Sequence, residues 1–148
     1  MDIQVKTFDQ LTKVEMYDML ALRSEVFVVE QHCAYQDIDF KDQKALHLLG
    51  KKDGRLVAYT RVFNANDYFD KASIGRVLVR DLYREHGYGH KILKASIEAI
   101  YSYFKEQPII LSAQQHLEKF YNLHGFIAIG QGYLEDGIPH IKMIKDRS

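Results

Sequence analysis

The run from Ile74 to His90 constrains the fold of this chain most, because it predicts a buried strand, a turn with two glycines and the start of a helix. Gly87 and Gly89 carry no Cβ, so the backbone N–H groups beside them are uncovered. The helix adds the unpaired N–H groups of its first turn and the positive end of its dipole. Together these features predict a site for a phosphate or diphosphate group.

Two common classes of phosphate-binding loop do not fit this run. A dinucleotide-binding loop has the pattern G-x-G-x-x-G/A, but Ile92 occupies the place of its last small residue. A P-loop needs Lys followed by Ser or Thr, whereas Lys91 is followed by Ile92. An ordinary strand-to-helix turn is the plain alternative. The pattern left to explain is Arg84-x-x-Gly87-x-Gly89.

This pattern resembles the (Q/R)-x-x-G-x-(G/A) diphosphate loop of the GNAT superfamily of N-acetyltransferases, in which the loop holds coenzyme A. A second motif lies after the apolar run 109–112, where Phe120 to Phe126 resembles the F-Y-x-x-x-G-F signature of the same superfamily. Further segments are similar to the ElaA-type branch of small GNAT proteins, namely 22–31, 35–37, 111–114 and 133–140. The resemblance extends from Leu11 to Met143 and implies a single GNAT acetyltransferase domain over residues 1–148.

Length and composition agree with one small-molecule domain. The chain has 148 residues, enough for one substantial core. Lys and Arg total 20, Asp and Glu total 20, and the basic residues are scattered, so we expect neither a nucleic-acid nor a membrane partner. No apolar run approaches the roughly 20 residues that cross a bilayer, and the N-terminus lacks the pattern of an export signal. We therefore expect a cytoplasmic protein.

Cysteine and histidine give no sign of a metal site. Cys33 is the only cysteine, so an internal disulfide is excluded. The seven histidines show neither H-x-x-x-H spacing nor pairing with cysteine. We expect no metal, and acetyl-CoA as the co-substrate that the resemblance implies.

The hydrophobic patterns predict elements in the order β-α-β-β-β-α-β-α-β-β. Strands are expected at 3–6, 46–51, 56–63, 72–79, 109–112, 126–131 and 138–144, and helices at 12–27, 88–105 and 117–123. A capping box of Thr12 and Glu15 opens the first helix. The apolar residues assigned to that helix are Val14, Tyr17, Ala21 and Leu22.

Turn residues and the resemblance complete the expected fold. Asp53-Gly54 indicates a tight hairpin, and Gly125 a left-handed cap after the last helix. The polar segment 30–44 is expected to be partly irregular and to lie on the acceptor side. The fold class is α/β, and the resemblance implies a GNAT-like mixed, mostly antiparallel sheet with helices on both faces and a splayed central strand pair.

The resemblance assigns the cofactor to the end of the central strand and the turn after it. Main-chain groups of Val77 and Val79, on either side of Leu78, would pair with the pantetheine arm and the thioester oxygen. Gln114 lies where the superfamily often has an Asn facing the cofactor, and Phe120 opens the second motif. The residues expected to cradle the diphosphate are Arg84, Glu85, His86, Gly87, Tyr88, Gly89 and His90.

Tyr121 is the expected general acid. It matches the tyrosine of the F-Y-x-x-x-G-F signature, which in many GNAT enzymes lies beside the coenzyme A sulfur. A phenol with a reference pKa of about 10 can donate a proton to a thiolate at neutral pH. Without the resemblance, a tyrosine on an apolar helix stripe is more often a core residue with a satisfied hydroxyl.

The general base remains open. Glu30 and His47 are the candidates to take a proton from the acceptor, directly or through water. Gln31, His32 and His140 are expected to contact the acceptor. For each of these residues, an ordinary hydrogen-bonded or surface role is the alternative. The carboxylates of Asp37, Asp39 and Asp42 are expected to make the acceptor entrance acidic, which suits an amine.

The resulting hypothesis is acetyl transfer from acetyl-CoA to a primary amine of a small molecule or peptide by direct attack. Cys33 offers a covalent route, but only His32 stands beside it, and neighbours on an extended chain point apart. A non-catalytic acyl-CoA-binding sensor or interaction module is the alternative. An acyl-homoserine-lactone synthase is a third reading, although the chain lacks the tryptophan usual there. The acceptor and the oligomeric state stay open, with a homodimer as one option.

Overall fold

A computed structural model describes residues 1–146 of the chain. The strands are β1 (Asp2–Thr7), β2 (Leu46–Lys52), β3 (Arg55–Phe63), β4 (Ala72–Val79), β5 (Ile109–Gln114), β6 (Ile127–Glu135) and β7 (Ile138–Lys145). The α-helices are α1 (Lys13–Arg23), α2 (Tyr88–Tyr103) and α3 (Glu118–Asn122), and a π-helix, η2 (Ser24–Glu30), continues α1. Short 3-10 turns are η1 (Phe8–Gln10), η3 (Asp42–Lys44), η4 (Asp81–Tyr83) and η5 (Gln115–Leu117). The predicted order of strands and helices is confirmed.

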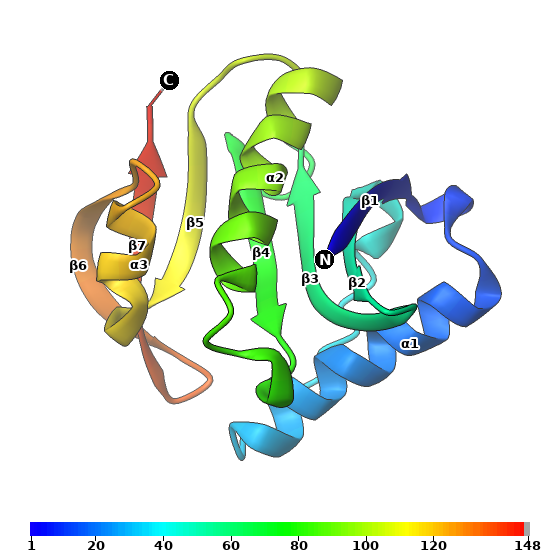
Figure 1. Ribbon diagram of the computed structural model, residues 1–148. Coiled ribbons are helices and arrows are strands. Elements are labelled where there is room, and N and C mark those ends of the chain that lie inside the picture. The colour runs from blue at the N-terminus through cyan, green and yellow to red at the C-terminus, as the bar shows by residue number, and fades with distance from the viewer. Residues whose placement is uncertain (147–148) are drawn as a thin grey trace.

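The seven strands form one sheet in the order β1-β2-β3-β4-β5-β7-β6 (Figure 1). Only β4 and β5 run parallel, and they pair only at Ala72 with Ile109 and at Ser73 with Ile110. Beyond these pairs the two strands diverge, which opens the middle of the sheet (Figure 1). The expected mixed, mostly antiparallel sheet with a splayed central pair is thus confirmed.

A β-bulge lies where β4 leaves β5. Arg61 of β3 pairs with Gly75, whereas Tyr59 pairs with Leu78, so β4 carries one residue more than β3 over this stretch. Arg76 has φ 52, in the left-handed region that non-glycine residues seldom occupy. A bulge bends its strand and re-aims a side chain. Here it turns β4 at the start of the opening.

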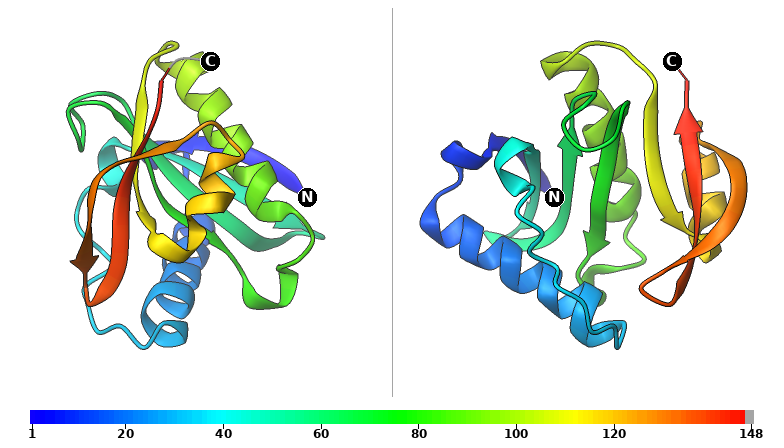
Figure 2. Two further views of the ribbon diagram at one scale, coloured as in Figure 1. Left: turned by 90° about the vertical axis from the view of Figure 1, so that its left-hand side faces the viewer. Right: turned by 180° about the vertical axis from the view of Figure 1, so that it is seen from behind.

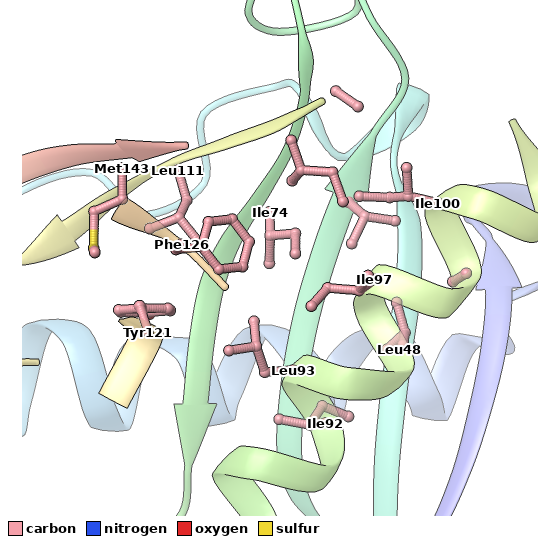
Figure 3. Close-up of a cluster of buried hydrophobic side chains, with 14 of the residues drawn as sticks. Leu48, Ile74, Ile92, Leu93, Ile97, Ile100, Leu111, Tyr121, Phe126 and Met143 are labelled. Carbon is pink, nitrogen blue, oxygen red and sulfur yellow. The ribbon is translucent and has the colours of Figure 1, made fainter. Parts of the chain in front are cut away.

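Helices cover both faces of the sheet, as expected. Side chains alternate between the faces, so Leu48 packs on the α2 side while its neighbour Leu49 packs on the α1 side. α2 lies in front of the sheet in Figure 1, and α1 lies in front in the reverse view of Figure 2. Figure 3 shows the larger cluster, in which Leu93 and Ile97 of α2 face Ile74 of β4.

The first helix differs from its prediction in the face that it buries. Val14 and Tyr17 are 68% and 77% exposed, and the buried residues of α1 are Met19, Leu22 and Arg23. Of the four predicted residues only Leu22 is buried, because apolar spacing alone does not show which side of the helix packs on the sheet. The predicted capping box is present, since the Glu15 N–H donates to Thr12 Oγ1 at 3.1 Å. The helical path also ends later than residue 27, as the π-helix reaches Glu30.

A buried network of ion pairs begins at Arg23, which is 0% exposed. Its Nε donates to Asp37 Oδ2 at 2.8 Å, and its Nη1 donates to Asp42 Oδ1 at 2.7 Å. Both carboxylates belong to the irregular segment that links η2 to β2. Arg23 therefore fastens this segment to α1.

Two further arginines of the sheet bind the same segment. Arg61 of β3 donates from Nη1 to Asp42 Oδ1 at 2.8 Å and pairs through Nη2 with Asp39 Oδ2 at 2.5 Å. Arg76, at the bulge, donates from Nε to Asp37 Oδ1 at 2.8 Å. The three aspartates are thus neutralised by arginines, because a buried carboxylate needs a charged partner. The expectation that they make an acidic entrance was wrong.

Replacing Arg23 by Met should destabilise the fold strongly, because Asp37 and Asp42 would lose a buried partner. Breaking a buried pair in this way costs about 3–5 kcal/mol. Urea unfolding measures the change. The control is Arg55→Met, at an exposed position of β3. Equal loss of stability in the two variants would contradict the role given to the network.

Acid should weaken the same network. Burial disfavours the ionised form of Asp39, but its hydrogen bonds to Arg61 and the charges of Arg61 and Arg76 outweigh this and lower its pKa to about 2. The pKa of Asp42 is also lowered, by Arg23 and Arg61, against the effect of burial. Because the folded pKa values lie below the unfolded value of about 3.9, the stabilisation is complete above about pH 4 and is lost as the pH falls toward 2.

Urea unfolding of the wild type and of Asp39→Asn between about pH 2.5 and pH 6 tests this dependence. The variant should lose less stability than the wild type as the pH falls. Asp18→Asn, at an exposed position of α1, should follow the wild-type curve. A wild-type curve that is flat over this range would contradict the prediction.

Candidate active site

Two cavities adjoin at the opening between β4 and β5. The loop cavity, of about 550 Å³, is bounded by the turn before α2, by α3 and by the end of η2. The sheet cavity, of about 150 Å³, lies along β4, β5 and β7 under the segment 31–35. The residues that line both are Phe27, Gln31, Val77, Gln114, Leu117 and Tyr121. A ligand in each cavity would therefore contact the same wall.

The loop cavity ends at an uncapped helix N-terminus. Gly87, the residue before α2, has φ 75, and no side chain caps the first turn of α2. That turn also holds no acidic residue, whereas α1 is closed by the Thr12 and Glu15 box. Glu85 has φ 70, so two of three successive residues in the turn are left-handed, a conformation typical of backbone anion nests. The site suits a diphosphate, as predicted from the glycine spacing.

The two glycines of the turn are required for different reasons. At Gly87 a side chain would meet no atom within 4 Å, but its positive φ disfavours any other residue. At Gly89 an added Cβ would lie 3.4 Å from two ring atoms of Phe120 and 3.8 Å from Val79 Cγ2. Gly89 thus allows Phe120 and Val79 to close around the cavity.

Gly89→Ile should weaken coenzyme A binding by about tenfold or more, since the added atoms would meet Phe120 and fill the diphosphate end of the cavity. Titration calorimetry with coenzyme A measures the loss. Ser102→Leu, at an exposed position near the end of the same helix, adds comparable bulk away from the cavity and should bind as the wild type does. Undiminished binding by Gly89→Ile would count against the loop as the diphosphate site.

Arg84 is already paired in this structure. Its Nη1 lies 2.7 Å from Glu30 Oε2, and its Nη2 donates to Glu30 Oε1 at 3.0 Å. Its Nε donates to the carbonyl oxygen of Val79 at 2.9 Å. A carbonyl that was expected to face the pantetheine arm therefore accepts from Arg84 instead. Glu30 and Arg84 both line the loop cavity, so their pair stands where a diphosphate would compete for the guanidinium.

Glu30→Gln should strengthen coenzyme A binding, because it removes the carboxylate charge that competes with the diphosphate for Arg84. The pair is about one-third exposed, so the gain should be that of a surface ion pair, about 0.2–1 kcal/mol or at most about fivefold in affinity. Glu25→Gln removes another exposed pair of the same π-helix, that with Arg80, and should leave affinity unchanged. Calorimetry measures both variants. Weaker binding by Glu30→Gln would contradict competition between Glu30 and the diphosphate.

The sheet cavity has a polar wall made by strand alternation. On β5, Leu111 and Ala113 face the core, so Ser112 faces the other side of the sheet. Tyr133 and Glu135 of β6 face the same side, since the Ser112 hydroxyl is hydrogen-bonded to the Tyr133 hydroxyl and donates to Glu135 Oε1 at 3.3 Å. His140 of β7 lies beside them, with Nε2 3.4 Å from Glu135 Oε2.

Tyr121 stands at the wall shared by the two cavities. It is 5% exposed, and its ring packs edge-on against Phe120. It also packs edge-on against Phe126, which lies near it in Figure 3. Burial raises the pKa of its phenol well above the ordinary value, so the hydroxyl stays protonated. It can therefore donate a proton to a ligand that spans the two cavities.

Most of the predicted cofactor residues line the loop cavity. They are Val77, Leu78, Val79, Arg84, Glu85, Gly87, Tyr88, Gly89, His90, Gln114 and Phe120. His86 does not line it and lies against the ring of Tyr88, with centroids 5.7 Å apart. Gln114 and Gln31 line both cavities.

The predicted histidines are separated by the fold. His140 lines the sheet cavity, and its Nδ1 donates to the Ile138 carbonyl at 2.7 Å. His32 is exposed and lines neither cavity. His47 is fully buried, with Nδ1 2.5 Å from the Tyr59 hydroxyl and Nε2 2.9 Å from the Asp42 carbonyl. Burial lowers the pKa of His47, but it reaches neither cavity, so we do not retain it as a base.

Several residues of the sheet cavity were missed by sequence reasoning. Ser73, Arg76 and Glu135 line it, but each comes from a segment that was interpreted only as strand or turn. Alternation along residues 133–135 could have placed Glu135 beside Tyr133. The bulge that re-aims Arg76 leaves no comparable pattern, because an arginine rarely occupies the left-handed region.

The described residues show neither a membrane-spanning helix nor a cluster of metal ligands. Within residues 1–146, no helix is long and apolar enough to cross a bilayer. The same residues contain no group of three or more His, Cys, Asp and Glu side chains arranged to hold a metal ion.

With the fold and the two cavities in view, the chain can be compared with known proteins. Residues 8–147 match the acetyltransferase (GNAT) domain, and the chain belongs to the GNAT acetyltransferase family. It is 40% identical to protein ElaA of Escherichia coli (strain K12) over 139 residues, which cover 93% of this chain and 91% of ElaA. The resemblance found in the motifs is therefore confirmed.

Solved structures agree with this assignment. The crystal structure of Escherichia coli ElaA has a TM-score of 0.92 and 37% identity, covering 99% of this chain and 100% of that one. An acyl-CoA N-acyltransferase from Pseudomonas aeruginosa has a TM-score of 0.92 and 39% identity, covering 98% and 99%. A CoA-dependent acyl-homoserine lactone synthase has a TM-score of 0.79 but 14% identity, covering 99% and 83%, and shares the fold alone. The chain is a GNAT-type acyltransferase. Its family membership supports the transfer of an acyl group from coenzyme A.

Proposed function

We propose that this protein transfers an acetyl group from acetyl-CoA to a primary amine of a small molecule or peptide in the cytoplasm. The observation that carries the proposal is Tyr121, a buried residue with a protonated hydroxyl at the wall shared by the two cavities. The loop cavity takes the acyl carrier, and the sheet cavity takes the amine.

The diphosphate binds the N–H groups at the start of α2 and displaces Glu30 from Arg84. The pantetheine arm then lies along Val77, Leu78 and Val79, which line the loop cavity. This places the thioester in the opening between β4 and β5, beside Tyr121. Binding in a fixed orientation lowers the entropic cost of the reaction.

The bound amine first loses the proton of its ammonium form to solvent. The neutral amine then attacks the thioester carbon directly, so a C–N bond forms and the C–S bond breaks. The Tyr121 hydroxyl gives its proton to the departing sulfur, which leaves as the thiol. The attacking nitrogen loses one proton, which restores the Tyr121 hydroxyl. Main-chain groups of β4 polarise the thioester oxygen, where negative charge develops.

Tyr121→Phe tests the acid role. Turnover should fall by about 100-fold, within the range of general acid catalysis, whereas coenzyme A affinity should change little because the ring remains. Steady-state kinetics and calorimetry measure the two quantities. The control is Tyr103→Phe, at an exposed position of α2. A variant with wild-type turnover at every pH would remove Tyr121 from the acid role.

The reaction itself is tested by incubating the protein with acetyl-CoA and a panel of amines, polyamines, amino acids and peptides. Thiol release that depends on both the protein and one class of amine is the expected result. Mass spectrometry of the product should show one added acetyl group. Tight coenzyme A binding without thiol release on the whole panel would instead favour the non-catalytic sensor.

A further inference from the structure

The sheet cavity carries a polar group that its fold leaves unsatisfied. Ser73 of β4 is 2% exposed and lines the cavity, and its Oγ has no hydrogen-bond partner within residues 1–146. A buried hydroxyl without a partner costs stability, so such groups often mark the place of a bound ligand. Ser73 pairs with Ile110 of β5. Ser112 is two residues beyond Ile110 and therefore faces the same side of the sheet. The unsatisfied hydroxyl thus belongs to the same face of the sheet and the same cavity as the polar wall.

Glu135 carries the negative charge of that wall, and two neighbouring strands hold its carboxylate in position. Its two carboxylate oxygens face groups of two other strands, Ser112 of β5 at 3.3 Å and His140 of β7 at 3.4 Å. Its side chain is still 50% exposed, so it can accept further hydrogen bonds. Asp136 also lines the cavity and adds a second negative charge beside it. This end of the cavity favours a cation.

The cations near the cavity are engaged elsewhere. Arg76 is the only Lys or Arg among the lining residues, and its Nε donates to Asp37 Oδ1 at 2.8 Å. Lys41 and Lys142 lie over the rings of Tyr68 and Phe69, at 5.6 Å and 5.0 Å from the ring centroids. A ligand cation is therefore directed away from these rings and toward Glu135.

The remaining wall is largely aromatic. Besides Tyr121 and His140, the rings that line the cavity are Phe27, Tyr35, Phe63, Tyr68 and Phe69. The ring centroids of Phe63 and Tyr68 lie 5.0 Å apart, and those of Tyr68 and Phe69 lie 4.7 Å apart. These three rings therefore form one contiguous surface. Such a surface fits an apolar or aromatic body better than a second charged group.

We propose that the sheet cavity selects a primary amine with an apolar or aromatic body, bound as its ammonium ion between Glu135 and Ser73. The inference rests on the proposed function, since it names the acceptor class for the same site. Glu135 accepts from the ammonium group, and the Ser73 hydroxyl accepts a second N–H. The aromatic wall holds the body of the molecule. Glu135 is in this scheme a specificity-determining residue.

Phenethylamine is a suitable probe, because it joins an ammonium group to an aromatic ring, and 2-phenylethanol is its uncharged counterpart. Binding of each compound is measured by calorimetry with coenzyme A present, on the wild type, Glu135→Gln and Ser73→Ala. The wild type should bind phenethylamine about tenfold or more tightly than 2-phenylethanol. Glu135→Gln should lose that preference, and Ser73→Ala should reduce it.

The matched control is Glu98→Gln, which removes one negative charge from an exposed position of α2. It should keep the wild-type preference, which separates a local contact from a change of net charge. Thermal unfolding of each variant shows whether it is folded. A wild type that does not prefer phenethylamine, or a folded Glu135→Gln that keeps the preference, would overturn the inference.

Thiol release from acetyl-CoA separates this inference from the proposed function. If amines drive thiol release and Glu135→Gln keeps the wild-type KM for phenethylamine, the assignment of Glu135 fails while the proposed function stands. If coenzyme A binds but no amine drives thiol release, the proposed function fails. A raised KM for phenethylamine in Glu135→Gln, with an unchanged KM for acetyl-CoA, supports both.

Discussion

The buried pairing of Arg23 with Asp37 and Asp42 is the interaction on which the sheet-cavity side of this molecule depends. The segment between η2 and β2 has little regular structure, so backbone hydrogen bonding alone cannot fix its path. Ion pairs do so instead, and they reach the bulge of β4 through Arg76. The same segment supplies Cys33 and Tyr35 to the wall of the sheet cavity. Buried ion pairs thus determine the shape of the sheet cavity.

The two faces of the sheet have different roles, because one packs the core and the other carries polar side chains. One face packs α2 and α3 and contains the larger apolar cluster (Figure 3). The opposite face of β5, β7 and β6 carries the polar side chains around Glu135. Because β4 and β5 separate after two residue pairs, the faces communicate through the opening, and Tyr121 is reached from both sides. A fully paired sheet would have kept the two ligands apart.

Local patterns predicted the fold well where one short stretch determines the outcome. The glycines of the turn, the Asp53-Gly54 hairpin and the strand alternation all act over a few residues, and the structure has each of them. Long-range pairing was not predictable in this way. Arg23 is buried because aspartates distant in sequence surround it, and His47 is enclosed by Tyr59 and Asp42 rather than open to a cavity. The contacts of Glu135 with Ser112 and His140 form only when β5, β6 and β7 assemble into the sheet.

The end of the π-helix has a thermodynamic consequence. Glu30 pairs with Arg84 in the lining of the loop cavity, while the next residue, Gln31, borders both cavities. Any shift of this short stretch when the carrier binds also alters the walls around the acceptor. By thermodynamic linkage such an effect is reciprocal, so each ligand changes the affinity of the protein for the other by the same factor. Binding of the two substrates is then coupled before any bond between them forms.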